Sequence, residues 1–258
     1  MTVNPALLTL SIDLELGLDQ QGKGFENRLE KATSELMRIL ENFRIGATWS
    51  VADPAISAAT GAIVHSKLDH EIAVLGETSW AGPGAGRQRF ARELDRRISS
   101  AQSQGITVST LTLRNTEIGG NLDLLVQSGI RVLRRGRIPT LTVAVPPKEL
   151  SYQGLLETPL SIQIPTNKRW DWTSGCRKAQ QLVDDAIHQR GHLHVVIDGA
   201  NLVTRLERSL QSISKLLAFC VTRQDEQQLQ ITTMRAYGER FLSAAAAIRS
   251  HSILRPAA

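Results

Sequence analysis

Short apolar segments alternate with amphipathic segments along most of the sequence, and this alternation constrains the fold more than any other feature. The apolar segments predict buried strands at 6–13, 45–56, 70–76, 106–114, 130–136, 192–203 and 229–234. Hydrophobic residues at helical spacing predict helices at 25–43, 86–105, 121–129, 206–224 and 236–248. Strand and helix in such regular alternation predict an α/β protein with a largely parallel sheet, most simply a (β/α) barrel.

The chain is long enough to form that barrel as one domain. Its 258 residues can bury a single core without disulfides or a structural metal. We therefore expect a single domain over 1–258. The range 139–172 is rich in Pro and Thr and lacks periodicity, which predicts an irregular excursion over one end of the sheet.

Nothing in the sequence indicates export or membrane insertion. The segment 1–15 lacks a basic leader region, its apolar run is interrupted by Asp13, and no later segment is long enough to span a bilayer. Cys176 and Cys220 form neither a metal-type pair nor a secreted framework, and we expect them to be buried thiols. These features predict a cytoplasmic protein.

The net charge of +5 raises the question of a polyanionic partner. A basic balance is common in proteins that bind nucleic acid or an acidic surface. The tight basic cluster is "RVLRRGR" at 131–137, for which a solvated turn is the simpler interpretation and a phosphate-binding patch the alternative. The sequence contains no recognisable nucleic-acid motif, so we do not expect nucleic acid as the partner.

Polar and aromatic residues gather where the predicted strands end. In a parallel barrel the carboxyl ends of the strands meet at one face, and ligands bind there. By this rule we expect one pocket at the carboxyl ends of the strands. The residues expected to line it are Asp13, Glu15, Trp49, Glu77, Trp80, Arg114, Asp198 and Asn201. We expect Arg114 to pair with Asp13 or Asp198. The polar members either bind a ligand or form a satisfied network that plugs the mouth of the barrel.

The tryptophans offer flat faces on which sugar rings can stack. Trp170 and Trp172 are spaced by one residue and would face the same side of an extended chain. Together with Trp49 and Trp80 they are candidate carbohydrate-binding residues, with core packing as the alternative for Trp49.

Several phrases of the sequence occur in an order typical of one enzyme family. They run from about Leu8 to Phe241 and are "LTLSIDLELG", "GATWSVAD", "DHEIAVLGETSW", "LRNTEIGGNLDLLVQSGIRV", "LLETPLSIQIP", "HLHVVIDGANLV" and "LQITTMRAYGERF". In these phrases the chain resembles the polysaccharide deacetylases, the NodB-homology group. The resemblance implies a distorted (β/α) barrel and a carbohydrate ligand. It also implies zinc or another divalent metal that activates water to remove an acetyl group from an N-acetyl sugar.

The resemblance places the family's metal ligands at positions that this chain has changed. Asp13 matches the first carboxylate of the opening motif, and Glu15 fits a variant of the metal-binding carboxylate after it. Leu75 and Ser79 stand where the two metal-binding histidines are expected. Leucine has no donor atom and a neutral serine hydroxyl is a poor ligand, so neither supports zinc. We therefore expect a catalytically degenerate site without a metal cofactor.

Two further positions complete the comparison with the family. Arg114 matches an arginine that orients the catalytic base, and Asp198 stands where a histidine normally protonates the leaving amine. If activity remains, the candidate catalytic residues are Asp13, Arg114 and Asp198.

The metal ligands could instead have been rebuilt from other residues. His70, Glu71 and Glu77 lie near the changed segment, although His70 and Glu71 point to opposite faces of a strand. His192 and His194 share one strand face. We expect those two histidines at the opening end of their strand, away from the pocket, in structural or surface roles.

Three functional hypotheses follow. In the first, a deacetylase-like protein binds a carbohydrate, or a protein partner in a glycan pathway, without metal-dependent deacetylation. In the second, it is an active hydrolase that cleaves amide or ester bonds of a glycan with altered ligands. The third, from another class, is a basic module that binds a polyanion.

Overall fold

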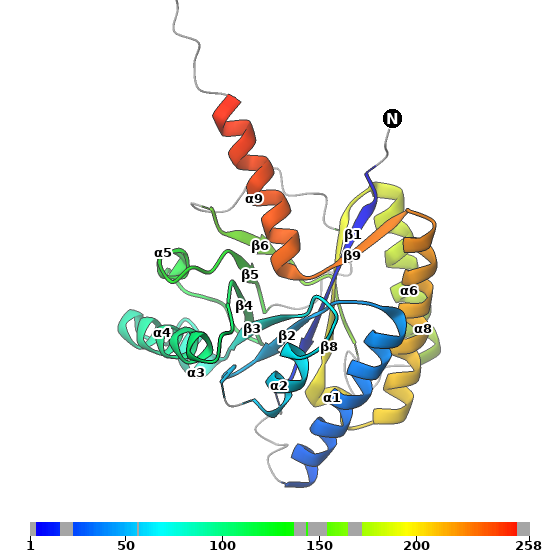
Figure 1. Ribbon diagram of the computed structural model, residues 1–258, viewed down its shortest axis with the longest axis horizontal. Helices are drawn as coiled ribbons and strands as arrows, with labels where there is room; N and C mark the ends of the chain where they lie inside the picture. Colours follow the sequence, from blue (N-terminus) through cyan, green and yellow to red (C-terminus); the bar gives the residue numbers. More distant parts are fainter. Residues whose placement is uncertain are drawn as a thin grey trace, which may run out of the picture.

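One curled parallel sheet forms the centre of the protein (Figure 1). The computed structural model describes residues 4–15, 23–55, 57–136, 143, 154–164 and 172–251, and for 58–59, 172–175 and 244–251 it describes the backbone alone. In this part of the chain nine strands make up the sheet: β1 (Ala6–Asp13), β2 (Thr48–Val51), β3 (Glu71–Gly76), β4 (Thr110–Leu113), β5 (Val132–Arg134), β6 (Leu156–Thr158), β7 (Ile162–Ile164), β8 (His192–Asp198) and β9 (Leu229–Thr232). Each strand pair is parallel.

The strand order confirms the predicted distorted (β/α) barrel. The order is β6-β5-β4-β3-β2-β1-β8-β7, with β9 beside β1. The consecutive strands β6 and β7 therefore lie at opposite edges of the curled sheet. Among the described residues no ladder joins these two edges, so the barrel is open at this seam.

β1 is the central strand because it pairs with three others. All of its residues are buried, as expected for a strand covered on both faces, and its polar residues Thr9, Ser11 and Asp13 alternate with apolar ones. Nearly its whole length pairs with β8, while Ala6–Thr9 pairs with β9 and Ser11–Asp13 with β2. This register puts Asp13 directly beside Asp198 at the carboxyl end of the sheet.

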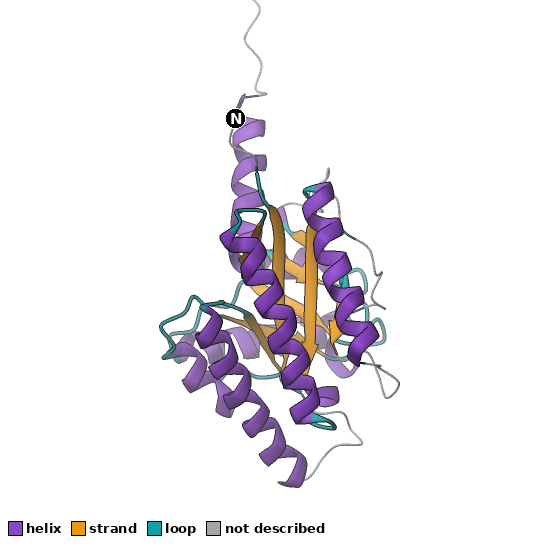
Figure 2. Cartoon of the chain, turned by 90° about the vertical axis from the view of Figure 1, so that its right-hand side faces the viewer, coloured by secondary structure: helices purple, strands orange, loops and turns teal. Residues whose placement is uncertain are grey.

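Helices cover the sheet. They are α1 (Lys23–Phe43), α2 (Ala58–Val64), α3 (Thr78–Ala81), α4 (Arg87–Ser103), α5 (Leu122–Gln127), α6 (Trp172–Gln189), α7 (Gly199–Leu202), α8 (Leu206–Asp225) and α9 (Met234–His251). Figure 2 shows α1, α8 and α6 side by side over one face of the sheet. In α1, Leu36 and Leu40 lie on the buried face, whereas Arg38 and Glu41 are exposed.

The range 139–172 contains more regular structure than the sequence predicted. Both β6 and β7 lie within it, and α6 begins at its last residue. Strands of three residues are too short to show a periodicity, which explains why they were missed. α6 was also absent from the predicted elements, although its buried residues recur at helical spacing, namely Ala179, Leu182, Val183 and Ala186.

α9 crosses the amino-end opening of the barrel. Glu71, at the start of β3, accepts a hydrogen bond from the backbone N–H of Arg235 at 2.8 Å. Two residues after Arg235 on α9, the Tyr237 ring stacks on the His192 ring with 4.0 Å between ring centroids. The amino end is closed by these packed groups, which leaves the carboxyl end for a ligand.

Within the described residues, no helix is long and apolar enough to cross a membrane. Both cysteines are free thiols, with Cys220 buried and Cys176 half-buried. Burial raises the pKa of the Cys220 thiol to about 12, so it stays protonated and unreactive near neutral pH.

The close packing of α9 against β5 should make Gly238 intolerant of a side chain. A Cβ at this position would lie 2.3 Å from Cγ2 of Val132, a stiff β-branched residue that is 1% exposed. We expect Gly238→Ala to lower the free energy of unfolding by about 1–3 kcal/mol, as overpacking usually does. Urea denaturation measures the effect.

Gly61→Ala in α2 is the matched control, because no atom lies within 4 Å of the added Cβ. Here alanine should raise the free energy of unfolding by up to about 1 kcal/mol through its better helix propensity. Equal effects of the two substitutions would contradict the packing of α9 on β5.

Candidate functional site

Two carboxylates lie next to each other at the carboxyl end of the sheet. Asp13 ends β1 and Asp198 ends β8, and the two residues are register partners. They are 5% and 6% exposed. Buried like charges destabilise a fold unless each is compensated. The structure gives each carboxylate its own set of partners.

Asp13 is paired with Arg134, the last residue of β5. Three strands, β4, β3 and β2, lie between β5 and β1 in the sheet. Nη1 of Arg134 donates to Oδ1 at 2.8 Å and Nη2 donates to Oδ2 at 2.7 Å. The same guanidinium donates to Ser11 Oγ at 3.0 Å and to the Leu113 carbonyl oxygen at 3.2 Å. Arg134 is 2% exposed, so this is a bidentate ion pair buried inside the barrel.

Arg134 is not among the residues that the sequence predicts for the site. The interpretation of 131–137 as a solvated turn is wrong for this residue, because β5 runs to Arg134 and is buried throughout. Strand alternation puts Val132 and Arg134 on one face and Leu133 on the other. An arginine within a buried strand requires a carboxylate partner, and that requirement was the available signal. Arg135 behaves as predicted, since it is half exposed and pairs with a carboxylate on β6.

Asp198 is held by neighbours on its own side of the sheet. The side-chain amides of Gln163 and Asn201 donate to its Oδ2 at 2.6 and 2.9 Å, and the Asn201 backbone N–H donates to Oδ1 at 3.2 Å, which caps α7. Burial, the largest influence, raises the pKa of Asp198, and the charge of Asp13 acts in the same direction while Arg114 opposes it.

Arg114 links two sides of the mouth. Its Nη2 lies 3.8 Å from Asp198 Oδ1, and its Nη1 donates to the Glu15 carbonyl oxygen at 2.9 Å. Of the two ion pairs predicted for Arg114, the structure shows the one with Asp198. Asp13 is held by Arg134 instead.

Glu15 and Glu77 are neighbours beside Arg114. Glu15 Oε1 accepts from the Ala52 backbone N–H at 2.8 Å. Burial raises the pKa of Glu15, and the nearby charge of Glu77 adds to the rise. The half-buried polar side chains around the mouth, which we call the rim, are Glu15, Glu77, Gln163 and Asn201.

The residues at the family's metal positions do not fit a divalent metal. Leu75 is fully buried in β3, and Ser79 is exposed on α3. Both carboxylate oxygens of Asp13 accept from Arg134. In the part of the chain that the structure describes, no three His, Cys, Asp or Glu side chains are arranged to hold a metal ion.

The proposed substitute ligands His70 and Glu71 lie at the amino end of β3, away from the mouth. Nδ1 of His70 accepts from the Ala47 backbone N–H at 3.0 Å. Glu71 is 1% exposed and accepts from the hydroxyls of Thr48 and Thr110. Both are occupied by structural hydrogen bonds, and of the three substitutes only Glu77 lies at the mouth.

His192 and His194 form part of a polar network inside the barrel. They lie at the opening end of β8 as predicted, but neither is on the surface, because they are 1% and 0% exposed. Thr9 Oγ1 lies 2.8 Å from His192 Nε2 and 2.6 Å from His194 Nδ1. His194 Nε2 lies 3.1 Å from Ser11 Oγ, which accepts from Arg134. The hydrogen-bonded network therefore runs from the closed amino end to the ion pair at the mouth.

Both histidines are neutral near neutral pH. Burial lowers the pKa of His192 to about 3. Burial also lowers the pKa of His194 well below its ordinary range, and the positive charge of Arg134 lowers it further. The cation inside the barrel is thus the guanidinium, and its counterion is Asp13.

Trp49 and Trp80 offer no open face to a sugar in this structure. Trp49 is 0% exposed and belongs to the core, which was the alternative interpretation. Trp80 is 2% exposed, stacks on Phe90 at a centroid distance of 5.8 Å, and has the Arg97 guanidinium 4.4 Å from its ring centroid. The short helix α3 turns Trp80 back onto α4, so the prediction that it binds a ligand is wrong here.

Trp170 lies outside the described residues. Trp172 is the first residue of α6, and its side chain also lies outside the described part. Their role in carbohydrate binding remains a prediction.

Sequence comparison and structure comparison give different results for this chain. No known family profile and no curated protein matches it in sequence. Among solved structures, it matches a protein from Mycobacterium smegmatis described as a polysaccharide deacetylase, with a TM-score of 0.71 and 14% identity over 100% of this chain and 97% of that one. It also matches an allantoinase with a TM-score of 0.63 and 13% identity, over 92% and 90% of the two chains.

A third match is a mutant of a CE4 family pseudoenzyme with restored enzymatic activity. Its TM-score is 0.53 at 9% identity, over 90% of this chain and 67% of that one. At these identities the matches establish the fold alone. The chain has the polysaccharide deacetylase fold that its motifs predicted.

Removing Arg134 should be strongly destabilising, because it leaves the buried Asp13 carboxylate without a counterion. We expect Arg134→Gln to lower the free energy of unfolding by about 3–5 kcal/mol. Arg135→Gln, one residue away, breaks an exposed pair and should cost about 0–1 kcal/mol. Adding Asp13→Asn to Arg134→Gln should recover part of the loss. A double variant that is no more stable than Arg134→Gln would contradict the pairing.

The buried neutral histidines should make the fold sensitive to acid. The pKa of His192 is lower in the folded protein than in the unfolded chain, so the unfolded chain binds more protons below its ordinary value of 6.5. The resulting loss of stability should reach about 1.4 kcal/mol per pH unit between the two pKa values. Burial raises the pKa of Glu71 and of Asp198, which acts in the opposite direction, so the wild type must be compared with His192→Gln.

Unfolding by urea at several values between pH 7 and pH 4 provides this measurement. The free energy of unfolding of the wild type should fall more steeply on acidification than that of His192→Gln. Parallel curves would show that His192 titrates normally in the folded protein.

Proposed function

We propose that the protein binds a carbohydrate at the mouth of the barrel and does not carry out metal-dependent deacetylation. The buried ion pair between Arg134 and Asp13 carries this proposal. It occupies both oxygens of the residue that matches the first carboxylate of the family's opening motif, and the position after it, where many members place the metal-binding aspartate, is Leu14. The two histidine positions of that site hold Leu75 and Ser79.

An arginine can replace the charge of a metal ion but not its chemistry. A catalytic metal keeps an open coordination position, where it binds water and converts it to hydroxide at neutral pH. A guanidinium has only N–H donors and binds no hydroxide. Arg134 therefore neutralises Asp13 and fixes its position, but it cannot supply the metal-bound hydroxide that metal-dependent deacetylation uses.

The rim supports a polar ligand. Gln163 and Asn201 present side-chain amides, and Glu15 and Glu77 present carboxylates, all of them half-buried. Amides and carboxylates are the groups that donate to and accept from sugar hydroxyls. Asp198 holds the amides of Gln163 and Asn201, and the Ala52 backbone N–H holds the Glu15 carboxylate, so these three groups are preorganised. A shared fold with a polysaccharide deacetylase is consistent with a carbohydrate as that ligand.

Metal analysis tests the catalytic half of the proposal. Protein purified without chelator and then exposed to zinc should retain less than about 0.1 equivalents once the excess is removed, because tight sites need three or four protein ligands. One retained equivalent that is lost in Asp13→Ala would show a rebuilt metal site, and the hydrolase hypothesis would then replace this one.

Calorimetric titration with a neutral N-acetylglucosamine hexasaccharide tests the binding half. Glu77→Ala removes a rim carboxylate and should weaken binding by roughly 10-fold, the value of one good polar contact. Glu239→Ala is the matched control, since it removes an exposed carboxylate from α9 at the closed end of the barrel. Equal affinities of both variants and the wild type would place the ligand elsewhere.

A further inference from the structure

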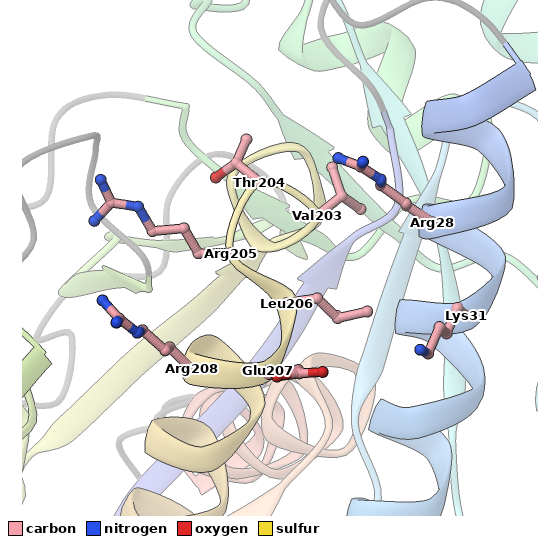
Figure 3. Close-up of a pocket in the computed structure, with 8 residues that line it drawn as sticks. All are labelled: Arg28, Lys31, Val203, Thr204, Arg205, Leu206, Glu207 and Arg208. Atoms are coloured by element: carbon pink, nitrogen blue, oxygen red, sulfur yellow. The ribbon is translucent and has the colours of Figure 1, made fainter.

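A second polar surface lies outside the barrel, between α1 and the start of α8 (Figure 3). It is a groove of about 600 Å³, which we call the basic groove, lined by Arg28, Lys31, Val203, Thr204, Arg205, Leu206, Glu207 and Arg208. Four of these residues are cationic and one is anionic. The groove thus concentrates positive charge in one concave site.

The cations are arranged as two pairs on two helical segments. Arg28 and Lys31 are three residues apart on α1 and share one helix face, whereas Arg205 directly precedes α8 and Arg208 lies in its first turn. Figure 3 shows Arg205 and Arg208 extending to the same side, away from α1. All four are exposed side chains.

None of these four cations is held in an ion pair by a described residue. Some exposed arginines elsewhere in the described chain have such partners, as in Arg38 with Glu35 and Arg87 with Asp123, whereas others, such as Arg89 and Arg92, do not. The groove differs in bringing four such cations to one concave surface. Grouping like charges without partners disfavours the free protein and favours whatever anion neutralises them. α8 adds to this potential, since the structure shows no side-chain hydrogen bond capping its first turn.

We propose that the basic groove binds the acidic groups of an anionic carbohydrate. None of the eight lining residues is aromatic, and stacking on aromatic side chains is the usual means of holding single-stranded nucleic acid. Thr204 and Glu207 instead offer a hydroxyl and a carboxylate to sugar hydroxyls. Two cation pairs on separate helical segments suit a chain that carries repeated negative charges.

The groove and the rim are close to each other along the chain. The lining of the groove starts at Val203, directly after α7, and Asn201 of α7 belongs to the rim. A sugar chain bound at the mouth would have to extend over α7 to reach the groove. The identification of the ligand as a carbohydrate rests on the proposed function, whereas the preference for an anion rests on the groove itself.

The experiment measures binding of three probes to the full chain by calorimetric titration. They are a sulfated heparin hexasaccharide, its desulfated and N-acetylated form that keeps only carboxylates, and the neutral N-acetylglucosamine hexasaccharide. Arg205→Glu/Arg208→Glu should weaken binding of the sulfated probe by at least about 10-fold, since each lost phosphate- or sulfate-type contact contributes strongly at moderate salt. Binding of the neutral probe should be unchanged.

Arg89→Glu/Arg92→Glu is the matched control. These exposed arginines are also three residues apart, but on α4, which lies across the molecule from α8 (Figure 1). The control makes the same change in net charge and should alter affinity for the sulfated probe by less than about 2-fold at moderate ionic strength. Arg28→Glu/Lys31→Glu should reproduce the loss from the α1 side. Circular dichroism checks that each variant is folded.

Several results would overturn the inference. These are equal weakening by the groove and control variants, unchanged binding by both groove variants, and tighter binding of a single-stranded DNA 12-mer than of the sulfated probe. If the wild type binds the neutral probe but neither acidic probe, the groove proposal fails and the mouth proposal stands. If it binds a sulfated probe through the groove, unaffected by Glu77→Ala, and does not bind the neutral probe, the mouth proposal alone fails.

Discussion

The buried ion pair between Arg134 and Asp13 is the interaction on which the inside of this barrel depends. Desolvating a carboxylate and a guanidinium is costly, and the cost is offset only when the geometry is good and the remaining hydrogen-bonding groups are satisfied. Here the pair is bidentate, and Ser11 Oγ and the Leu113 carbonyl oxygen accept further hydrogen bonds from the guanidinium, although its buried Nε has no hydrogen-bond partner among the described residues. The pair joins β1 to β5 across the curled sheet. It therefore fixes the curvature of the half-barrel at the end where a ligand would enter.

Burial is the main reason why both histidines are neutral, and for His194 this arrangement lowers the pKa further. Arg134 supplies a permanent positive charge at the centre of the barrel, and Asp13 balances it. A second cation nearby would have no counterion, which is one reason why the pKa of His194 is so low. The imidazoles can then only exchange hydrogen bonds with Thr9 and Ser11. A site built in this way has a fixed cation instead of an exchangeable one. A guanidinium balances the charge of a carboxylate, but unlike a catalytic metal ion it offers no open coordination position for water.

Sequence patterns predicted those helices and strands whose conformation follows from the residues of the segment itself. The long apolar run ending in Asp13, the helix over 25–43 and the strand ending in Asp198 each have enough residues to show a period, and strand ends in a parallel barrel must meet. Partner choice across the barrel is different, because it depends on the curl of the sheet and not on any local period. For this reason the pairing of Arg134 with Asp13 was missed, as were the three-residue strands β6 and β7. The side chain of Trp80 was predicted to face the pocket for a related reason. The one-turn helix α3 turns this side chain toward α4, whereas an extended chain would have directed it elsewhere.

The distribution of paired and unpaired charge separates two kinds of surface in this protein. At the mouth each acidic group at a strand end has a close partner, with Asp13 held by Arg134 and Asp198 by Arg114, Gln163 and Asn201. The aspartates are thus fixed in position, and the rim carboxylates Glu15 and Glu77 lie beside them, an arrangement that suits recognition of hydroxyl groups by position. The basic groove has the opposite character, because its cations are exposed and unpaired among the described residues. The electrostatic attraction between these cations and an anionic ligand is long-ranged and is weakened by salt. Such attraction brings a ligand to the protein but does not fix its orientation. A ligand with both hydroxyls and acidic groups would use the two surfaces for different purposes: the groove would hold the chain near the protein, and the mouth would determine which sugar is bound.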